Sequence, residues 1–358
     1  MPLSFYPLTV TDVRRETRDA VVLTLTVPEE HIQTFRFKQG QYLTFRSQLE
    51  GEEVRRSYSI CAAVQDPHLR VGIKKVPGGL FSTWANEQVA PGQVLEAMPP
   101  MGNFYTPLDL ANRKHYVGFA AGSGITPVLG ILKTILLTEP HSAFTLVYGN
   151  RASSTIMFRE ELEDLKNAFL GRFSLIHILS REQQDIELFN GRITKDKCEQ
   201  LARYWIDFKT VDAAFICGPQ EMMLQVSEAL QEQGLDKTHI KFELFASEGQ
   251  RRERKVQVAP VDTRRDLCEA TVILDGIGRR LALPKNTDTI LNAALNEGLE
   301  LPYACKAGVC STCRALLVEG EVDMDANYSL EDYELARGYI LTCQSYPMTD
   351  SVVVDFDK

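Results

Sequence analysis

Four cysteines near the C-terminus are the residues of this chain whose types and spacing most clearly predict chemistry. Three of them lie in one short stretch, as Cys305, Cys310 and Cys313, and the fourth, Cys343, follows much later. The pattern C-x4-C-x2-C…C is the plant-type spacing for a [2Fe–2S] cluster, in which four thiolates bind two irons. Gly308 lets the loop wrap closely enough to direct backbone N–H groups at the sulfurs. The spacing therefore predicts a carrier of single electrons.

Other interpretations of the cysteines have less support. A structural zinc site usually takes paired C-x2-C knuckles, and this region contains only one such pair. Disulfides are not expected, because the N-terminus shows no export signal. Cys61, Cys198 and Cys268 lack ligand-like spacing, so we expect packing or surface thiols. The six histidines are scattered without an H-E-x-x-H motif, which predicts no separate metal site.

Two short motifs in the first third of the chain are typical of a flavin site. In Arg56-Ser-Tyr58-Ser59 the arginine can neutralise a pyrophosphate, the tyrosine ring offers a flat face, and the serine hydroxyl can donate to a flavin edge atom. Farther on, Gly78-Gly-Leu-Phe-Ser-Thr83 places glycines before hydroxyls, as at a helix N-terminus that holds phosphate. A plain strand followed by a turn would look similar, so each motif alone is weak.

A glycine-rich turn follows the apolar run 116–121, in the order Gly122-Ser-Gly-Ile-Thr126-Pro127. Glycines at the carboxyl end of a strand allow the backbone to approach a dinucleotide. Pro127 replaces the last glycine of a full G-x-G-x-x-G motif and suits the first turn of a helix. Cys217-Gly218-Pro stands at a later strand end, and both turns would lie on the crevice side of a parallel sheet.

The choice of nicotinamide nucleotide has its own signal. The run 173–179 ends in Ser180-Arg181-Glu182, and Arg192 follows after Gly191. A hydroxyl and two guanidiniums suit the doubly charged 2′-phosphate of NADPH, whereas an NADH enzyme more often places a carboxylate on the ribose. The pattern favours NADPH. One alternative is that the enzyme uses NADH. The other is that the two arginines are simply exposed surface residues.

Three blocks of sequence must position these motifs. Residues 1–109 contain short β-rich runs between turns, which predict an antiparallel barrel or sandwich. Residues 110–248 alternate apolar strands with helices, as in a doubly wound parallel sheet. The strands expected in the first block are 20–27, 41–45, 56–61 and 69–75, and those of the second are 116–121, 144–148, 173–179, 213–217 and 240–245, with helices at 127–137, 157–169 and 221–233.

The third block, 262–358, follows a polar and basic segment, 249–261, that reads as an exposed linker. We expect a hairpin formed by 270–274 and 279–283 around Asp275-Gly276-Ile277-Gly278. A helix is predicted over 289–297 with Asp288 as its N-cap, followed by the cysteine loop and strands over 314–319 and 352–356.

Composition sets broad limits. The 358 residues, 44% hydrophobic and 24% charged, describe an ordinary globular protein of two or three domains. No apolar run approaches a membrane span, so we expect a cytoplasmic protein without membrane partners. Most of the net charge of −9 falls after Val261, where acidic residues could steer the chain toward a basic docking surface or simply keep it soluble. Nothing favours nucleic acid as a partner.

The three motifs R-x-Y-S, G-S-G-I-T-P and C-G-P-x-x-M occur in the order found in the ferredoxin–NADP reductase superfamily, which the chain resembles over nearly its whole length. The cysteine-bearing block resembles a plant-type ferredoxin. The resemblance implies an N-terminal FAD-binding β-barrel, an α/β nucleotide domain and a C-terminal β-grasp ferredoxin domain. Among fused members, stretches 301–306, 327–331 and 350–357 resemble the reductase components of bacterial monooxygenases that degrade aromatic compounds.

The resemblance also implies roles for single residues. Those expected at FAD are Arg56, Tyr58, Ser59, Val71, Lys74, Gly79, Leu80, Phe81 and Ser82. Those expected at the nicotinamide nucleotide are Gly122, Thr126, Cys217 and Gly218, with Ser180, Arg181 and Arg192 at the 2′-phosphate. Hydride transfer between cofactors needs no acid–base dyad, so no catalytic residue is predicted, and Ser59, Thr126 and Cys217 are expected nearest the reacting atoms. Glu243 and Phe245 lie near where relatives cover the flavin, although a core or edge-strand role is as plausible for both.

The predicted function is electron transfer from NADPH through FAD and the [2Fe–2S] cluster to an external acceptor. A flavin takes two electrons together and releases them singly, which connects a hydride donor to a one-electron centre. The resemblance implies that the acceptor is the di-iron oxygenase component of a monooxygenase that epoxidises an aromatic acyl-CoA. The alternatives are another acceptor, such as a Rieske oxygenase or a hybrid-cluster protein, and a redox sensor without turnover.

Overall fold

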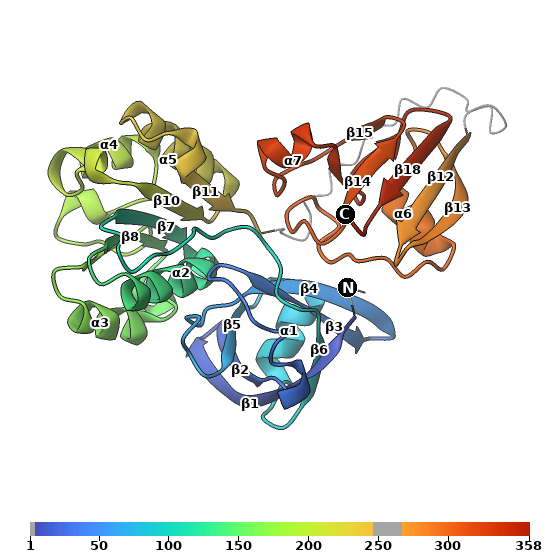
Figure 1. Ribbon diagram of the computed structural model, residues 1–358. Coiled ribbons are helices and arrows are strands. Elements are labelled where there is room, and N and C mark those ends of the chain that lie inside the picture. Colours follow the sequence, from blue (N-terminus) through green and yellow to red (C-terminus); the bar gives the residue numbers. More distant parts are fainter. Residues whose placement is uncertain (1–3, 246–266) are drawn as a thin grey trace. The chain divides into compact units, whose positions relative to one another are not determined.

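The computed structural model describes residues 4–245 and 267–358 (Figure 1). It divides into two compact units. The larger contains Phe5–Val54 and Tyr58–Phe245, and the smaller contains the C-terminal segment. The predicted linker, 249–261, lies outside the described residues. Over the described ranges, no helix has both the length and the apolar composition needed to cross a membrane.

The N-terminal part of the larger unit is a six-stranded antiparallel sheet, which confirms the predicted class. Its strand order is β4-β3-β6-β1-β2-β5, and helix α1 (Leu80–Glu87) packs against it. Alternating apolar side chains such as Leu8, Leu23 and Phe45 are fully buried in its core. The strands are β1 (Tyr6–Thr17), β2 (Ala20–Thr26), β3 (Tyr42–Leu49), β4 (Glu52–Ser59), β5 (Leu69–Lys74) and β6 (Val94–Ala97).

The second part is a parallel sheet in the order β11-β10-β7-β8-β9, with α2 and α3 on one face and α4 and α5 on the other (Figure 1). Along the chain, β7 is the first strand of this sheet, and β8 and β9 are added on one side of it. The chain then crosses back to add β10 and β11 on the other side, so the direction of winding switches between β7 and β10. A crevice at the carboxyl ends of these two strands is where such sheets bind ligands. The elements are β7 (His115–Ala121), α2 (Ile125–Thr138), β8 (Ala143–Asn150), α3 (Arg159–Ala168), β9 (Phe173–Leu179), α4 (Lys195–Tyr204), β10 (Ala213–Cys217), α5 (Gln220–Glu232) and β11 (Ile240–Glu243).

Helix α2 differs from the others because it is buried over nearly its whole length. Its sequence is correspondingly apolar apart from Lys133, its one charged residue, which is typical of a helix enclosed between two layers. Helix α3, by contrast, buries only Leu162 and carries charge on its other faces. The strand expected over 240–245 ends two residues early, at Glu243, and helix α4 was not predicted.

The C-terminal unit contains a mixed five-stranded sheet, β13-β12-β18-β14-β16, and the small pair β15-β17. The predicted hairpin is confirmed, but its turn is shorter than expected, because Ile277 and Gly278 already pair with β12. Asp275 and Gly276 both adopt positive φ, and the Asp357 carboxylate accepts both of their backbone N–H groups. The elements are β12 (Leu267–Leu274), β13 (Ile277–Pro284), α6 (Ile290–Asn296), β14 (Arg314–Glu319), β15 (Val322–Met324), α7 (Asp332–Ala336), β16 (Tyr339–Leu341), β17 (Ser345–Pro347) and β18 (Ser351–Asp355).

The predicted cap of the helix at 289–297 is wrong by one residue. Thr289 is the N-cap of α6, and its hydroxyl accepts from the Asn292 backbone N–H at 3.2 Å. Asp288 lies just outside the helix, where its carboxylate accepts the Thr289 N–H at 2.8 Å and the Asn292 side-chain amide at 3.3 Å. Both residues are good capping types, so sequence alone does not separate them.

Candidate functional sites

A polar group formed by three distant segments lies at the carboxyl edge of the parallel sheet. Ser59, at the end of β4, is buried, and its hydroxyl donates to Glu243 Oε2 at 2.8 Å. Glu243 ends β11 and is paired in parallel register with Cys217, the last residue of β10. The structure therefore brings Ser59 and Cys217 to a carboxylate for which the sequence left a core or edge-strand role open.

Burial controls the protonation of this group. It raises the pKa of Glu243 to about 7, and the hydrogen bond from Ser59 opposes that shift only in part. Burial also raises the pKa of Cys217, and the nearby Glu243 charge adds to the effect. At neutral pH Cys217 is therefore a thiol, whereas Glu243 exchanges a proton in the working range.

The two glycine turns meet at the switch point of the sheet. A Cβ added to Gly124 would lie 2.1 Å from the Cys217 carbonyl oxygen, and one added to Gly218 would lie 3.1 Å from the Ala121 Cβ. Only glycine permits the first approach, so the turns after β7 and β10 are held edge to edge. Gly122 has φ +55°, with open space around its Cα, and its carbonyl accepts from the Tyr148 hydroxyl at 2.9 Å.

Thr126 connects this crevice to the N-terminal sheet. It is buried in the first turn of α2, and its hydroxyl donates to the Ser123 carbonyl at 3.0 Å. A Cβ added to Gly72 of β5 would come within 2.8 Å of the Thr126 methyl group. The neighbouring Val71 is buried and forms a β-bridge with Ile60, the residue after Ser59. The structure thus places Val71 and Thr126 near the Ser59 end of β4.

The predicted phosphate site is the N-terminus of α1. Gly79 is the N-cap, without a side-chain hydrogen bond to the helix, and Gly78 adopts φ +77°. The first N–H groups of a helix have no intrahelical acceptor, so this end suits a pyrophosphate. The Ser82 hydroxyl, however, accepts from the Val76 N–H and donates to the Gly79 carbonyl, so it shapes the turn instead of standing open to a ligand.

The remaining residues predicted at FAD have mixed surroundings. Phe81 is a core residue whose ring lies 5.5 Å from that of Tyr58, so its side chain is occupied in packing. Lys74 pairs with Asp19 at 3.7 Å. Arg56 donates to the Arg55 carbonyl at 2.9 Å. Leu80, half-buried, opens α1 next to the cap.

The loops predicted at the 2′-phosphate also lie together. The Ser180 N–H donates to the Asn150 carbonyl, and the Arg181 N–H donates to the Arg151 carbonyl at 2.7 Å. The Gly191 N–H donates to the Leu179 carbonyl, which brings Arg192 to the same edge. Within the described part of the chain, Arg151, Arg181 and Arg192 have no carboxylate partner.

Two residues of this edge were not predicted from the sequence. Arg151 adds a third guanidinium, and the available signal was its position directly after strand β8. Asn150 is 8% exposed, and its side-chain amide nitrogen has no hydrogen-bond partner among the residues described. A buried amide without a partner is costly unless a ligand or water satisfies it. Glu182 faces the other way: it accepts from the Ser153 N–H, which lowers the pKa of its carboxyl.

The cysteine loop is shaped for its sulfurs. Lys306, Gly308 and Ser311 all adopt positive φ, and a Cβ added to Gly308 would lie 2.7 Å from the Ala326 carbonyl oxygen. The Ala307 N–H donates to Cys305 Sγ at 3.3 Å. The Gln344 side chain donates to the Lys306 carbonyl and thereby ties the loop to the segment that carries the fourth cysteine.

The four thiols converge in this loop. Cys310, Cys313 and Cys343 are buried, and Cys305 is partly exposed. Hydrogen bonds from Cys310 and Cys343 hold the pKa of Cys305 below its usual value, and the Cys343 thiol also contacts Cys313. Within the ranges described, no three side chains are arranged to hold one metal ion. A binuclear cluster divides four thiolates between two irons, so the four residues fit it without such a group.

Comparison with known proteins identifies three domains. Residues 7–105 match the oxidoreductase FAD-binding domain family, residues 119–228 the oxidoreductase NAD-binding domain family, and residues 272–348 the 2Fe-2S iron-sulfur cluster binding domain family. These matches confirm the predicted cofactor classes: FAD, a nicotinamide nucleotide and a [2Fe–2S] cluster.

Curated relatives align over the whole chain. One of the component proteins of the 1,2-phenylacetyl-CoA epoxidase of Escherichia coli K12 is 45% identical, covering 99% of this chain and 98% of the relative. The ferredoxin reductase component of 3-ketosteroid-9-alpha-monooxygenase from Rhodococcus rhodochrous is 34% identical, with 98% and 96% covered. Both relatives are components of larger enzyme systems, an epoxidase and a monooxygenase, and the second is named as a reductase component.

Solved structures share the fold. Phthalate dioxygenase reductase has a TM-score of 0.58 at 23% identity, with 98% of each chain covered. A type IV self-sufficient cytochrome P450 monooxygenase has a TM-score of 0.67 at 21% identity, over 98% of this chain and 41% of that one. The likeness supports the three predicted fold classes.

Proposed function

Since this chain belongs to the ferredoxin–NADP reductase superfamily, as an NAD(P)H-dependent reductase with FAD-binding and [2Fe–2S] domains, we propose that it carries electrons from NADPH to the oxygenase of a phenylacetyl-CoA epoxidase. The observation that carries the proposal is the full-length relation, at 45% identity, to a component of that enzyme. The chain would then serve phenylacetate catabolism without contacting the aromatic substrate. We assign residues 1–109 to FAD binding, 110–248 to the nucleotide and 262–358 to the cluster.

Different residues of the chain would bind FAD and the nicotinamide nucleotide. When bound, FAD would supply the chemistry that connects a donor of hydride to a cluster that takes electrons singly. Backbone N–H groups at the start of α1 would hold the FAD pyrophosphate, and we assign the neutralisation of its charge to Arg56. The close contact of Gly124 with Cys217 keeps side chains out of the crevice so that the nucleotide can approach the backbone.

Ser59 and Glu243 supply a proton-holding pair at the same place. The carboxyl can hold a proton near neutral pH, and the Ser59 hydroxyl donates to Glu243 Oε2 when the carboxyl is ionised. Because Ser59 is buried and Glu243 partly so, this pair exchanges protons with limited access to water. Thr126 and Cys217 close the neighbouring walls. We therefore assign these four residues to the flavin–nicotinamide junction.

NADPH is the proposed donor because cationic side chains collect at the ends of β8 and β9. Arg151, Arg181 and Arg192 lie on loops joined by backbone hydrogen bonds, and Ser180 adds a hydroxyl. Guanidinium groups pair well with a phosphate dianion. Glu182, the carboxylate next to Arg181, accepts hydrogen bonds from Ser153, so it is not directed to a ribose.

Two measurements test the proposal. Anaerobic titration of the purified holoprotein with NADPH and then NADH, followed by visible and EPR spectra, should bleach the flavin and give the signal of a reduced [2Fe–2S] cluster, with NADPH effective at lower concentration. Oxidation of NADPH should then depend on the epoxidase oxygenase component. Faster turnover with a steroid monooxygenase component would favour the function of the second relative instead. We place the protein in the cytoplasm, where NADPH and acyl-CoA esters occur.

A further inference from the structure

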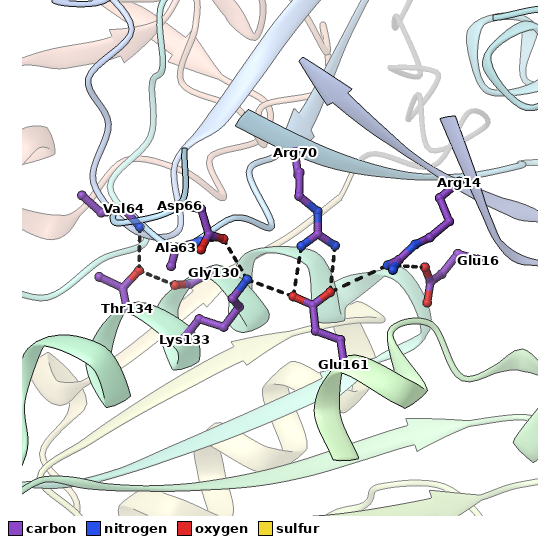
Figure 2. Close-up of polar contacts among 10 residues, drawn as sticks. All are labelled: Arg14, Glu16, Ala63, Val64, Asp66, Arg70, Gly130, Lys133, Thr134 and Glu161. Atoms are coloured by element: carbon purple, nitrogen blue, oxygen red, sulfur yellow. Dashed lines mark hydrogen bonds and ion pairs between the residues drawn. The ribbon is translucent and has the colours of Figure 1, made fainter. Parts of the chain in front are cut away.

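A cluster of charged side chains joins the N-terminal sheet to the nucleotide domain within the larger unit (Figure 2). Glu161, on α3, lies at its centre. Arg70 of β5 donates to both carboxylate oxygens, at 3.1 and 2.7 Å, and Lys133 of α2 donates to Oε1 at 2.9 Å. Arg14 of β1 adds a third cation at 3.8 Å. We call these four residues the interdomain cluster.

The cluster is largely shielded from water. The side chains of Glu161, Arg70 and Lys133 are 18%, 19% and 11% exposed. Burial alone would raise the pKa of Glu161, but Arg70 and then Lys133 outweigh it and hold the pKa at about 2. The carboxylate is therefore ionised at any working pH and neutralises cations contributed by both domains. Lys133 has a second partner, Asp66, at 2.8 Å.

Helix α2 connects this cluster to the nicotinamide crevice. Thr126, Gly130 and Lys133 are spaced four and three residues apart, so they share one helix face. That face lies against the N-terminal sheet: Thr126 against Gly72, and Gly130 so close that an added Cβ would be 2.7 Å from the Ile60 carbonyl oxygen. Seven residues of helix span about 10 Å. Glu161 therefore binds Lys133 at one end of this helix face, and Thr126 at the other end borders the crevice.

A second contact anchors the start of α3. Phe158, its N-cap, adopts φ +58°, which is unusual for a bulky residue. Its ring is fully buried, and its N–H donates to Glu16 Oε1 of β1 at 2.6 Å. The first turn of α3 is therefore tied to the N-terminal sheet through its backbone, and Glu161 is tied one turn later through its side chain.

We propose that Glu161 is a positioning residue for hydride transfer, which sets the angle between the flavin and nucleotide domains by neutralising Arg70 and Lys133 across their boundary. The proposal rests on the passage of hydride from nicotinamide to FAD. Without the carboxylate, Arg70 on one domain would lose its ion-pair partner, and Lys133 on the other would keep only Asp66. The two largely buried positive charges would then repel each other across the boundary. A misplacement of about 1 Å between reacting groups can cost about 100-fold in rate.

The direct test is Glu161→Gln, which preserves shape and removes charge. In anaerobic stopped-flow experiments with the FAD-loaded protein, the rate constant for flavin reduction at saturating NADPH should fall by about 10- to 100-fold. The Kd for NADPH should stay within about twofold, because the nucleotide loops lie elsewhere. The charge-transfer absorbance of the reduced flavin with NADP⁺ should weaken. Glu160→Gln is the matched control, since Glu160 is exposed and has no ionic partner in the described structure.

A double-mutant cycle tests whether the effect passes through Arg70. The double variant Arg70→Gln with Glu161→Gln should be slowed by much less than the product of the two single effects, because both variants break one pair. Additive effects would overturn the assigned route. Flavin reduction needs no oxygenase, so these results stand or fall separately from the identity of the acceptor.

A readout independent of turnover is hydrogen exchange at the domain boundary. The Val64 N–H donates to the Thr134 hydroxyl at 3.2 Å, and the Phe158 N–H donates to Glu16, so both amides report contact between the domains. Both should exchange about 10-fold faster in Glu161→Gln and unchanged in Glu160→Gln. If Glu161→Gln does not fold with FAD, Glu161→Asp, which keeps the charge but retracts it, should show the same changes to a smaller degree. Wild-type reduction rates and exchange in the folded variant would overturn the proposal.

Discussion

The cysteine loop and the flavin–nicotinamide junction are assembled in opposite ways. The loop takes three of its four sulfurs from nine consecutive residues, shaped by local positive φ values at Lys306, Gly308 and Ser311. The junction takes Ser59, Cys217 and Glu243 from three strands far apart in the chain. A local site can be identified from its spacing, whereas a junction of distant strand ends becomes visible only in the fold. The two sites should also fail independently.

The largest expected effect comes from Cys310→Ser, which replaces a buried cysteine of the proposed ligand set. Reduction of one-electron acceptors such as cytochrome c should become undetectable, because the hydroxyl is a poor substitute for a thiolate. Flavin reduction by NADPH should stay within about twofold of wild type. Cys268→Ala, at a buried thiol of the same unit outside the loop, should retain both reactions. Loss of flavin reduction in a folded Cys310→Ser protein would show that the two sites are not independent.

Gly124→Ala should break the junction and leave the cluster loop intact. The new methyl group would meet the Cys217 carbonyl at 2.1 Å, so the two turns must separate. We expect flavin reduction by NADPH to fall by about 100-fold, as for a misplacement of about 1 Å, while dithionite still reduces the cluster. Gly122→Ala is the comparison: the space there is open, and only the positive φ costs about 1 kcal/mol. Equal effects of the two variants would mean that the close approach is unimportant.

Arg181→Gln tests whether the nucleotide end of the crevice binds the 2′-phosphate of NADPH. If its guanidinium pairs with the 2′-phosphate, kcat/KM for NADPH should fall by about 10-fold, corresponding to about 1.4 kcal/mol. The value for NADH should change little. Arg151→Gln should act in the same direction, because the Arg181 N–H donates to the Arg151 carbonyl and places both on one edge. A uniform loss for both nucleotides would argue against a phosphate contact.

Glu243→Gln should remove a pH dependence from the junction. The pKa of Glu243 is raised to about 7, so the folded protein holds a proton there between pH 4.5 and 7 that the unfolded chain releases. The contribution of this group to stability is therefore greatest at low pH and is lost as the pH rises through about 7. The rate of flavin reduction in the wild type should change several-fold around pH 7, and that of Glu243→Gln should be flatter. An unchanged pH profile would exclude the carboxyl as its source.

The pKa shift of Glu161 has the opposite sign to that of Glu243. Its pKa is lowered to about 2, so its stabilising effect is fully present above about pH 4.5 and is lost as the pH falls toward 2. The shift corresponds to about 3 kcal/mol at most, since each pKa unit is about 1.4 kcal/mol. Acid unfolding followed by circular dichroism should be less steep in Glu161→Gln than in the wild type below pH 4.5. The same slope in both proteins would contradict a native ion pair.

The sequence by itself determined what periodicity and short spacing can encode. Alternating apolar runs identified most strands of the three domains, the Asp275-Gly276 turn identified its hairpin, and the cysteine spacing identified the cluster loop. Errors occurred where neighbouring residues are chemically equivalent, as with Asp288 and Thr289 at the start of α6. They also occurred where a helix buries few residues, as in the missed α4, in which only Cys198 and Leu201 are buried.

Only the tertiary structure decided which distant residues meet. Glu243 reads as an ordinary polar residue at a strand end until parallel pairing sets it beside Cys217 and the neighbouring sheet brings Ser59 to it. The role proposed for Arg151 follows from a backbone hydrogen bond between its carbonyl and Arg181. The role proposed for Glu161 follows from its ion pairs with cations on three other elements. The physical reason is that strand and helix periods fix which face a residue occupies, while the approach of one face to another depends on packing across the whole domain.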